Sequence, residues 1–396
     1  MDLADGLGRL TYCSNIHPGE RWDDVRRVLA ERVPLVKARV APERTMGVGL
    51  RLAAVAAEAL DAPEALADLQ GLLRGHHLDV FTLNGFPYGP FHGTAVKDQV
   101  YQPDWRTDER LAYSNRLADI LAALLPEGGF GTVSTVPGTF KPLAPGNEAL
   151  MAARMLDHVA HLVDLRARTG RTIALALEPE PCCFLETIAE AVDFFERHLF
   201  ADAAVARLAE RSGLTRGEAR DALPRHLGLC YDVCHAAVEW EDPAASLDAL
   251  AAAGVPVHKL QLSAALRLDR VSPEARAALA AFDEPTYLHQ VVARTPDGGL
   301  HRHVDLPDAL ARGAAADGEA WRVHFHVPIF IAEIAPFATT QDFLRAVLAR
   351  HRERPIAPHL EVETYSFDVL PEALRGVPVE DAVARELHWV LGELTR

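Results

Sequence analysis

The sequence lacks the features that would secrete, anchor or cross-link the chain. Its five cysteines are odd in number and show no paired CxxC spacing, so we expect reduced thiols and a cytoplasmic location. Residues 1–20 contain no basic segment followed by an apolar one, and no signal peptide is expected. No apolar run approaches the ~20 residues that cross a bilayer, which predicts no membrane insertion.

Positive charge is also scarce. The chain carries 40 Lys and Arg against 56 Asp and Glu, which gives a formal net charge of −16 at pH 7. Such a surface repels phosphate backbones, and no run of basic residues offsets it. We therefore expect no nucleic-acid partner. With 49% hydrophobic and 24% charged residues, the composition is otherwise that of an ordinary globular protein.

Short strand-like runs alternate with helical stretches along the chain. A capping box of Thr187 and Glu190, for example, marks the start of one helix. The predicted strands cover residues 10–16, 47–52, 78–85, 131–136, 172–177, 227–231, 257–262 and 359–364. Eight βα pairs in a row predict a parallel sheet, and eight is the number that closes into a barrel. The predicted fold class is therefore α/β, a (β/α)8 TIM barrel, with a doubly wound sheet as the alternative.

One region is too long for a βα loop. Residues 263–320 follow the seventh strand, contain a predicted hairpin at 296–299 and precede a ninth strand-like run at 323–329. We expect an insertion that lies over the barrel mouth, within a single domain of residues 1–396. Residues 201–224 are expected to form an extra helical pair after the fifth strand.

Polar side chains gather where the predicted strands end. Residues two apart on a strand point the same way, and the carboxyl ends of barrel strands form the active site. At the ends of four consecutive strands stand Glu178, Asp232, Gln261 and Glu363. Several buried carboxylates need a cation or bound partners. Their joint occurrence points to a functional site, although each acidic residue alone is more often structural.

The structural alternatives are specific. Glu180, which precedes a proline, fits a helix cap, and Asp232 with His235 fits a cap and a solvated helix residue. Glu361 fits an internal ion pair with Lys259. The cysteines fit small buried hydrophobic residues.

The strand ends resemble those of the xylose-isomerase-like barrel superfamily, which includes sugar epimerases and endonuclease IV. The match lies in Leu-Glu-Pro at 177–179, Tyr-Asp-Val-Cys-His at 231–235 and Leu-Glu-Val-Glu-Thr at 360–364. The whole chain is most similar to EboE, a metabolite-traffic family within that superfamily. The stretches that carry this second likeness are 10–19, 83–88, 97–105, 324–328 and 360–365.

The resemblance implies a divalent metal held by Glu178, Asp232 and Glu363. The sequence departs from the epimerases at the end of the seventh strand, where Gln261 replaces a histidine. An amide oxygen is a harder ligand than imidazole, which favours Mn²⁺ or Mg²⁺, with Zn²⁺ as the alternative. Another arrangement is that His326 or His324, near the insertion, supplies the missing imidazole.

The implied activity is a metal-dependent isomerase or epimerase that acts on a sugar or cyclitol, in the synthesis or export of a small metabolite. Glu178 and Glu363 are the predicted catalytic residues. The predicted substrate-binding residues are Asn15, His17, Asn84, His92, His235 and His324. The expected partners are a small polyhydroxylated metabolite and other proteins of a metabolite-export cluster. The alternatives are a non-catalytic small-molecule binding protein in metabolite traffic and a metal-dependent phosphodiesterase of the endonuclease IV kind.

Overall fold

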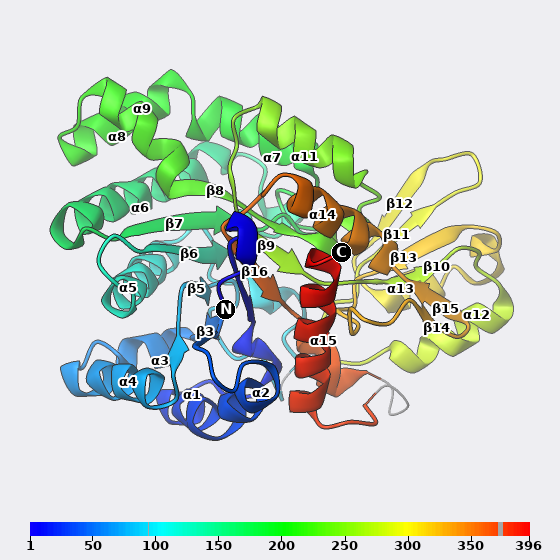
Figure 1. Cartoon of the computed structure of the whole chain (residues 1–396). Coiled ribbons are helices and arrows are strands. Elements are labelled where there is room, and N and C mark those ends of the chain that lie inside the picture. The colour runs from blue at the N-terminus through cyan, green and yellow to red at the C-terminus, as the bar shows by residue number, and fades with distance from the viewer. Residues whose placement is uncertain (94, 371–374) are drawn as a thin grey trace.

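The centre of the molecule is a sheet of eight strands whose neighbours all pair in parallel (Figure 1). The computed structural model describes residues 1–93, 95–370 and 375–396. The strand order is β1-β16-β9-β8-β7-β6-β5-β3. The strands are β1 (Arg9–Tyr12), β3 (Leu50–Arg51), β5 (Thr82–Asn84), β6 (Phe130–Thr135), β7 (Thr172–Leu177), β8 (Leu227–Asp232), β9 (Val257–Leu262) and β16 (His359–Val362).

The two edges of this sheet meet at Gly49. Its N–H donates to the carbonyl of Tyr12 at 2.9 Å, its own carbonyl accepts from the N–H of Ser14 at 2.7 Å, and Cys13 pairs with Gly49 in parallel. The sheet therefore closes on itself, and the predicted (β/α)8 barrel is confirmed.

Two predicted strands are interrupted. The run at 47–52 becomes β2 (Met46–Gly47) and β3, and the run at 78–85 becomes β4 (Leu78–Asp79) and β5. The first halves, β2 and β4, pair only with each other. The second halves belong to the barrel and carry residues to its carboxyl end.

Helices cover the outside of the barrel (Figure 1). They are α1 (Trp22–Arg27), α2 (Val33–Val40), α3 (Ala54–Ala59), α4 (Pro63–Gly75), α5 (Asp108–Leu124), α6 (Glu148–Thr169), α7 (Ile188–Phe194), α8 (Asp202–Ser212), α9 (Arg216–His226), α10 (Val233–Val238), α11 (Pro243–Ala252), α14 (Gln341–Glu353) and α15 (Val379–Leu394). The helical pair predicted at 201–224 is confirmed as α8 and α9. In the part of the chain that the structure describes, no helix has the length and apolar character to span a membrane.

Strand β7 shows why the barrel wall is stable. Its alternate residues Ile173, Leu175 and Leu177 belong to the main hydrophobic core, where they pack among helical residues such as those of α6. The residues between them, Ala174 and Ala176, are small and fully buried, and they point into the barrel. The large residues face the helices, which leaves space in the interior for the polar side chains of neighbouring strands.

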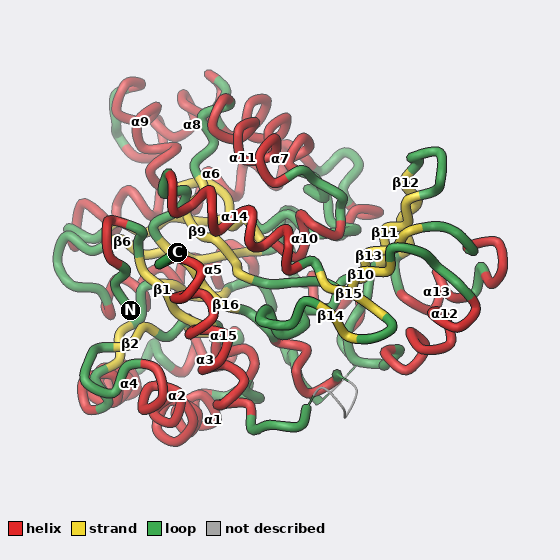
Figure 2. The backbone as a smooth tube through the Cα atoms, turned by 45° about the vertical axis from the view of Figure 1, so that its right-hand side comes forward, coloured by secondary structure: helices red, strands yellow, loops and turns green. Residues whose placement is uncertain are grey.

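A second sheet is inserted after the seventh barrel strand. Its six strands pair antiparallel in the order β12-β11-β13-β10-β15-β14. They are β10 (Leu266–Leu268), β11 (Val291–Arg294), β12 (Leu300–His303), β13 (Ala320–Val323), β14 (Glu333–Ile334) and β15 (Phe337–Thr339), with α12 (Pro273–Leu279) and α13 (Leu306–Leu310) between them. Figure 2 shows this sheet beside one end of the barrel.

The structure bears out one detail of this insertion and corrects another. The predicted hairpin is present as β11 and β12, joined by a turn in which Thr295 N–H donates to Gly299 O at 2.9 Å. The strand predicted at 323–329 is wrong, because β13 ends at Val323 and residues 324–328 have no regular structure. A tight turn, in which Phe325 N–H donates back to Val323 O at 2.9 Å, takes the backbone out of the sheet.

Candidate metal centre

Four polar residues meet where neighbouring barrel strands end. Asp232 closes β8 and pairs in register with Gln261 of β9, while Glu178 and Glu363 directly follow β7 and β16. The backbone ladder continues through the two glutamates, because Glu178 N–H donates to Thr135 O and Glu363 N–H to Leu262 O, each at 3.1 Å. Their side chains are therefore held by the sheet.

The three carboxylates are close together and almost fully buried. Glu178, Asp232 and Glu363 offer ligand atoms within 4.8 Å of one another, and their exposed fractions are 2%, 2% and 4%. Burial raises the pKa of Glu178 well above its usual value, and the charges of Glu363 and then Asp232 raise it further. Burial also raises the pKa of Glu363. The cluster is unfavourable as three bare anions.

His326, in the irregular segment after β13, brings an imidazole to the same place. Its Nε2 lies 3.9 Å from Asp232 Oδ2. Its Nδ1 donates to the backbone carbonyl of Glu363 at 2.9 Å, so Nδ1 carries the proton and Nε2 presents a lone pair. His326 thus occupies the role left open when Gln261 stands in place of histidine.

Several of the atoms at this centre have no partner. Among the described residues, no hydrogen bond reaches Glu178 Oε2, Asp232 Oδ2, His326 Nε2 or either amide atom of Gln261. A buried polar atom left unpaired costs about 1–3 kcal/mol. Two carboxylate oxygens and one imidazole nitrogen, all unsatisfied, are the kind of donors that a divalent transition metal takes. The residues therefore fit a metal ion.

Two asparagines orient Glu363. Its Oε1 accepts a hydrogen bond from Asn15 Nδ2 at 2.6 Å and another from Asn84 Nδ2 at 2.9 Å. These bonds fix Oε1 and leave Oε2 for the site. Both asparagines were predicted to bind substrate; in the structure their amides hold a candidate ligand of the metal, a role typical of the residues behind a metal site.

Asp232 is both a helix cap and a candidate ligand. Its Oδ1 accepts from the His235 N–H at 3.0 Å, which caps α10, and from Ser263 Oγ at 2.7 Å, while Oδ2 stays free. His235 follows one turn later and donates from Nδ1 to Pro179 O at 3.0 Å. Capping and ligation are compatible here because they use different oxygens.

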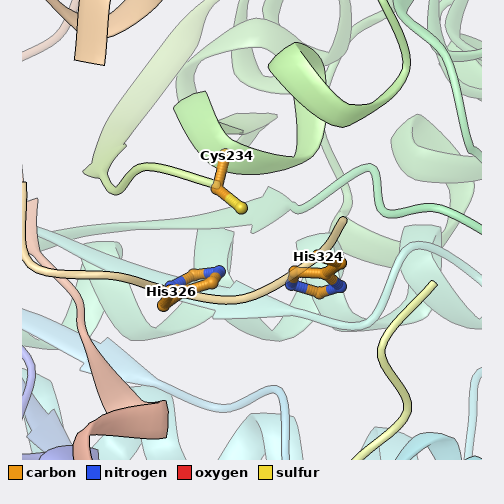
Figure 3. A group of neighbouring side chains, drawn as sticks. All are labelled: Cys234, His324 and His326. Carbon is orange, nitrogen blue, oxygen red and sulfur yellow. The ribbon is translucent and has the colours of Figure 1, made fainter. Parts of the chain in front are cut away.

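His324 and His235 meet beside this centre. Their Nε2 atoms are 3.1 Å apart, and His324 Nδ1 lies 2.6 Å from Gln290 Oε1. Figure 3 shows Cys234, at the start of α10, directing its sulfur toward the segment that carries His324 and His326. Burial raises the pKa of the Cys234 thiol well above its usual value, and only a thiolate binds metal well. The Cys234 thiol donates to Phe325 O at 3.7 Å, and all five cysteines are free and buried.

Two residues predicted to bind substrate lie elsewhere. His17 contacts Tyr12 Oη through Nε2 at 3.3 Å, and burial lowers its pKa to about 4. His92 packs edge-on against Phe91 with ring centroids 5.1 Å apart. The described residues that line the central cavity include Phe91 and neither histidine.

A cavity lined by Glu178 and Glu363 opens above the carboxylates. Its floor is polar and consists of Asn15, Asn84, Glu178, Glu180, His235, His324 and Glu363. Its walls come from aromatic and aliphatic residues of the loop after β5, the insertion and the loop after β16. Such a shape, with few polar groups at one end, is typical of a small-molecule site.

Glu180 is the main site residue that sequence reasoning missed. It was predicted to cap a helix, yet it lines the cavity, where Tyr101 Oη donates to its Oε1 at 2.9 Å. Burial raises its pKa to about 8. The signal was present, because Glu180 shares the side-chain parity of Glu178. For Tyr101 and Tyr365, which also line the cavity, no comparable strand parity in the sequence indicated a place in the site.

Comparisons with known proteins give likenesses of fold only. No protein-family model matches the chain, and no curated protein matches its sequence. Similar solved structures include the IOLI protein with a bound zinc atom (13% identity, 98% of this chain and 97% of that one, TM-score 0.45). A second is a D-tagatose 3-epimerase-like protein, with 10% identity over 98% of this chain and 98% of that one and a TM-score of 0.49. A third is AsbF of Bacillus anthracis, a probable 3-DHS dehydratase, with 11% identity over 98% of this chain and 99% of that one and a TM-score of 0.45. None of these likenesses tests the resemblance to EboE, which stays a prediction.

Proposed function

We propose that this protein is a metal-dependent isomerase or epimerase of a small polyhydroxylated molecule, a sugar or cyclitol. The observation that carries the proposal is the buried group of Glu178, Asp232 and Glu363, in which Glu178 Oε2 and Asp232 Oδ2 are unpaired and His326 Nε2 lies 3.9 Å from Asp232. Glu178 and Glu363 also line the cavity. The resemblance to EboE adds the context of synthesis or export of a metabolite.

Glu178, Asp232, Glu363 and His326 would hold the metal ion, with Gln261 beside them. A mixed oxygen and nitrogen set suits Mn²⁺ or Zn²⁺, whereas Mg²⁺ prefers oxygen alone. When bound, such a cation polarises a carbonyl and stabilises the negative charge that develops on neighbouring oxygens when a proton leaves carbon.

The two glutamates are placed to move that proton. Glu178, whose side chain lines the cavity, takes the proton from the substrate carbon beside the carbonyl and holds it until it is returned. Glu363 is fixed through Oε1 by Asn15 and Asn84, so its Oε2 keeps one direction while the proton is moved. Return of the proton from Glu178 to the neighbouring carbon gives an isomer. For an epimer, Glu363 starts protonated and delivers its proton to the opposite face of the same carbon, so that the two glutamates end with exchanged protonation states.

His235 and His324 bind the hydroxyls. Both line the cavity, and both rings are oriented from behind, by Pro179 O and by Gln290 Oε1. A ring fixed at Nδ1 presents Nε2 in one direction, and here the two Nε2 atoms lie 3.1 Å apart, so a substrate hydroxyl would replace their mutual contact.

The test has two stages. Calorimetric titration of Mn²⁺ and Zn²⁺ into metal-free protein should show one site per chain. Sugars and cyclitols are then incubated with loaded protein in D₂O, and NMR should show deuterium entering a carbon-bound position of at least one of them. Glu178→Gln should abolish the exchange, and Glu274→Gln, on an exposed helix of the insertion, serves as the matched control. Metal binding without exchange in any compound would favour the non-catalytic binding protein.

A further inference from the structure

The outer half of the cavity is aromatic. Phe91, Tyr287 and Tyr365 form a cluster of three rings. The ring centroid of Phe91 lies 5.0 Å from that of Tyr287 and 5.3 Å from that of Tyr365, and the two tyrosine centroids are 5.2 Å apart. These rings come from three separate segments, namely the loop after β5, the insertion and the loop after β16. Phe91 and Tyr287, with Val96, also form a small hydrophobic cluster apart from the main core. All four residues line the cavity.

The aromatic cluster begins next to the candidate metal ligands. The ring of Tyr365 lies 4.6 Å from the imidazole of His326, and Tyr365 is two residues beyond Glu363. No layer of protein separates the polar floor from the aromatic wall, because both line the same cavity. A molecule that reaches the carboxylates with one end therefore lies against the rings with the other.

The cavity offers no cation to an anionic substrate. Among its described lining residues, Lys97 is the only lysine or arginine. The Lys97 ammonium has three hydrogens, and it donates to Tyr287 O at 2.7 Å, Asp305 Oδ2 at 2.7 Å and Glu284 O at 3.2 Å. Its donors are thus committed to holding the insertion against the loop after β5. Glu180, on the floor, adds further acidic character.

We propose that the substrate is an uncharged polyhydroxylated ketone that carries an apolar substituent of about ring size, such as an aryl or alkyl glycoside in which one ring hydroxyl is oxidised to a carbonyl, or an aryl-substituted ketocyclitol. The parent glycosides and cyclitols, which lack that carbonyl, are its non-reacting analogues. The inference rests on the proposed function for the polar end. The hydroxyls lie at Glu178, Glu363 and the histidines, and the substituent packs against Phe91, Tyr287 and Tyr365. A charged substituent is disfavoured at the aromatic end, because Lys97, the one lysine or arginine among the described lining residues, already donates to three protein oxygens.

Matched ligands test the substituent separately from the polar end. Calorimetry on Mn²⁺-loaded protein compares methyl and phenyl β-glycosides of glucose, galactose, mannose and xylose, together with phenyl-substituted cyclitols and glucose 6-phosphate. In at least one pair, the phenyl compound should bind about tenfold more tightly than the methyl compound, because burying a ring is worth about 1.5–3 kcal/mol. Glucose 6-phosphate should bind no more tightly than glucose.

Variants then locate the ring. Phe91→Ala should reduce the preference for phenyl to about threefold or less while the Mn²⁺ affinity stays unchanged, and Phe91→Leu should retain part of it. Phe330→Ala removes a half-buried ring outside the cavity that stacks with Arg385, and it should leave the preference intact. Circular dichroism checks that each variant is folded.

The two proposals fail in different ways. Absence of Mn²⁺ and Zn²⁺ binding would overturn the proposed function. Metal binding with equal affinities for methyl and phenyl compounds, with no phenyl compound bound at all, or with preferred binding of the phosphate, would overturn the inference about the substrate and leave the metal site standing.

Discussion

Two layers of buried acid lie one above the other inside the barrel, and the protein treats them differently. In the lower layer, Glu361 and Lys259 are both fully buried and pair at 2.6 Å. In the upper layer, one strand period further on, the described residues include no lysine or arginine in an ion pair with Glu178, Asp232 or Glu363. The lower layer contains its own cation. The charge of the upper layer must be neutralised by protons or, as proposed, by a cation from outside.

The backbone is also adapted to the lower layer. A Cβ at Gly49 would lie 1.4 Å from Glu361 Oε2, so glycine at the closing point of the barrel makes space for that carboxylate. The Lys259 charge also lowers the pKa of Glu178, but by less than burial and the neighbouring acids raise it. A permanent internal cation gives a structural pair, and an unfilled upper layer gives a site that can exchange its ion.

Removing the internal cation should have the largest effect. Lys259→Met leaves Glu361 as an unpaired buried carboxylate and should lower the free energy of unfolding by about 3–5 kcal/mol, as measured by urea denaturation. The double variant with Glu361→Gln should recover most of this loss. A single variant as stable as wild type would show that the lower layer is not a structural pair.

Supplying the external cation should stabilise the upper layer. At about 100 times its dissociation constant, Mn²⁺ should raise the free energy of unfolding by about 2.7 kcal/mol, and EDTA should reverse the gain. Urea denaturation with and without the ion measures the difference. Identical urea denaturation curves with and without Mn²⁺ would show that the upper layer binds no stabilising cation.

Neutralising an acid of the upper layer should not lower the free energy of unfolding, whereas neutralising Lys259 of the lower layer should lower it. Metal-free Glu178→Gln should be at least as stable as wild type, because an unfavourable buried charge is lost. Its Mn²⁺ affinity should fall by about tenfold or more in calorimetric titration.

Asn84→Ala, which removes one of the two amides that hold Glu363, should also lower the affinity for Mn²⁺ by about tenfold. Equal affinities in all three proteins would place the ion elsewhere.

The smallest expected effect is on pH dependence. The pKa of Glu180 is raised from 4.5 to about 8, so the native state holds a proton that the unfolded chain has already released. The stability from this group is complete below pH about 4.5 and is lost as the pH rises through about 8. Glu180→Gln, whose amide oxygen can still accept from Tyr101, should flatten the loss across that window. Thermal unfolding of metal-free protein at several pH values tests this, and an unchanged slope would contradict it.

Most of the barrel could be predicted from the sequence because its signals are local. Strand period two and the abrupt ends of apolar runs predicted β7 and β9 to the residue, and the same parity brought Glu178, Asp232 and Glu363 together. The interrupted strands could not be foreseen, because no local feature of the runs at 47–52 and 78–85 marks the point where each strand breaks.

The segment around His326 shows a different limit. Alternate polar residues at 322, 324 and 326 predicted a strand, but they alternate for different reasons. Arg322 stacks on Trp240 with its guanidinium carbon 3.9 Å from the ring centroid, whereas His326 reaches the metal centre from irregular backbone. The alternation at 322, 324 and 326 is the one expected of a strand, but separate tertiary contacts produce it. The local sequence does not distinguish the two origins.

The pairing of Asn15 with Glu363 joins residues 348 positions apart. A ribosome releases Asn15 early and Glu363 nearly last, with Glu178, Asp232 and His326 between them. No growing chain contains the complete ligand set until its final strand has emerged and β16 has closed between β1 and β9. On the proposed function, the ion binds its full ligand set only after residue 363 has been synthesised, and chains that stop earlier lack a finished centre.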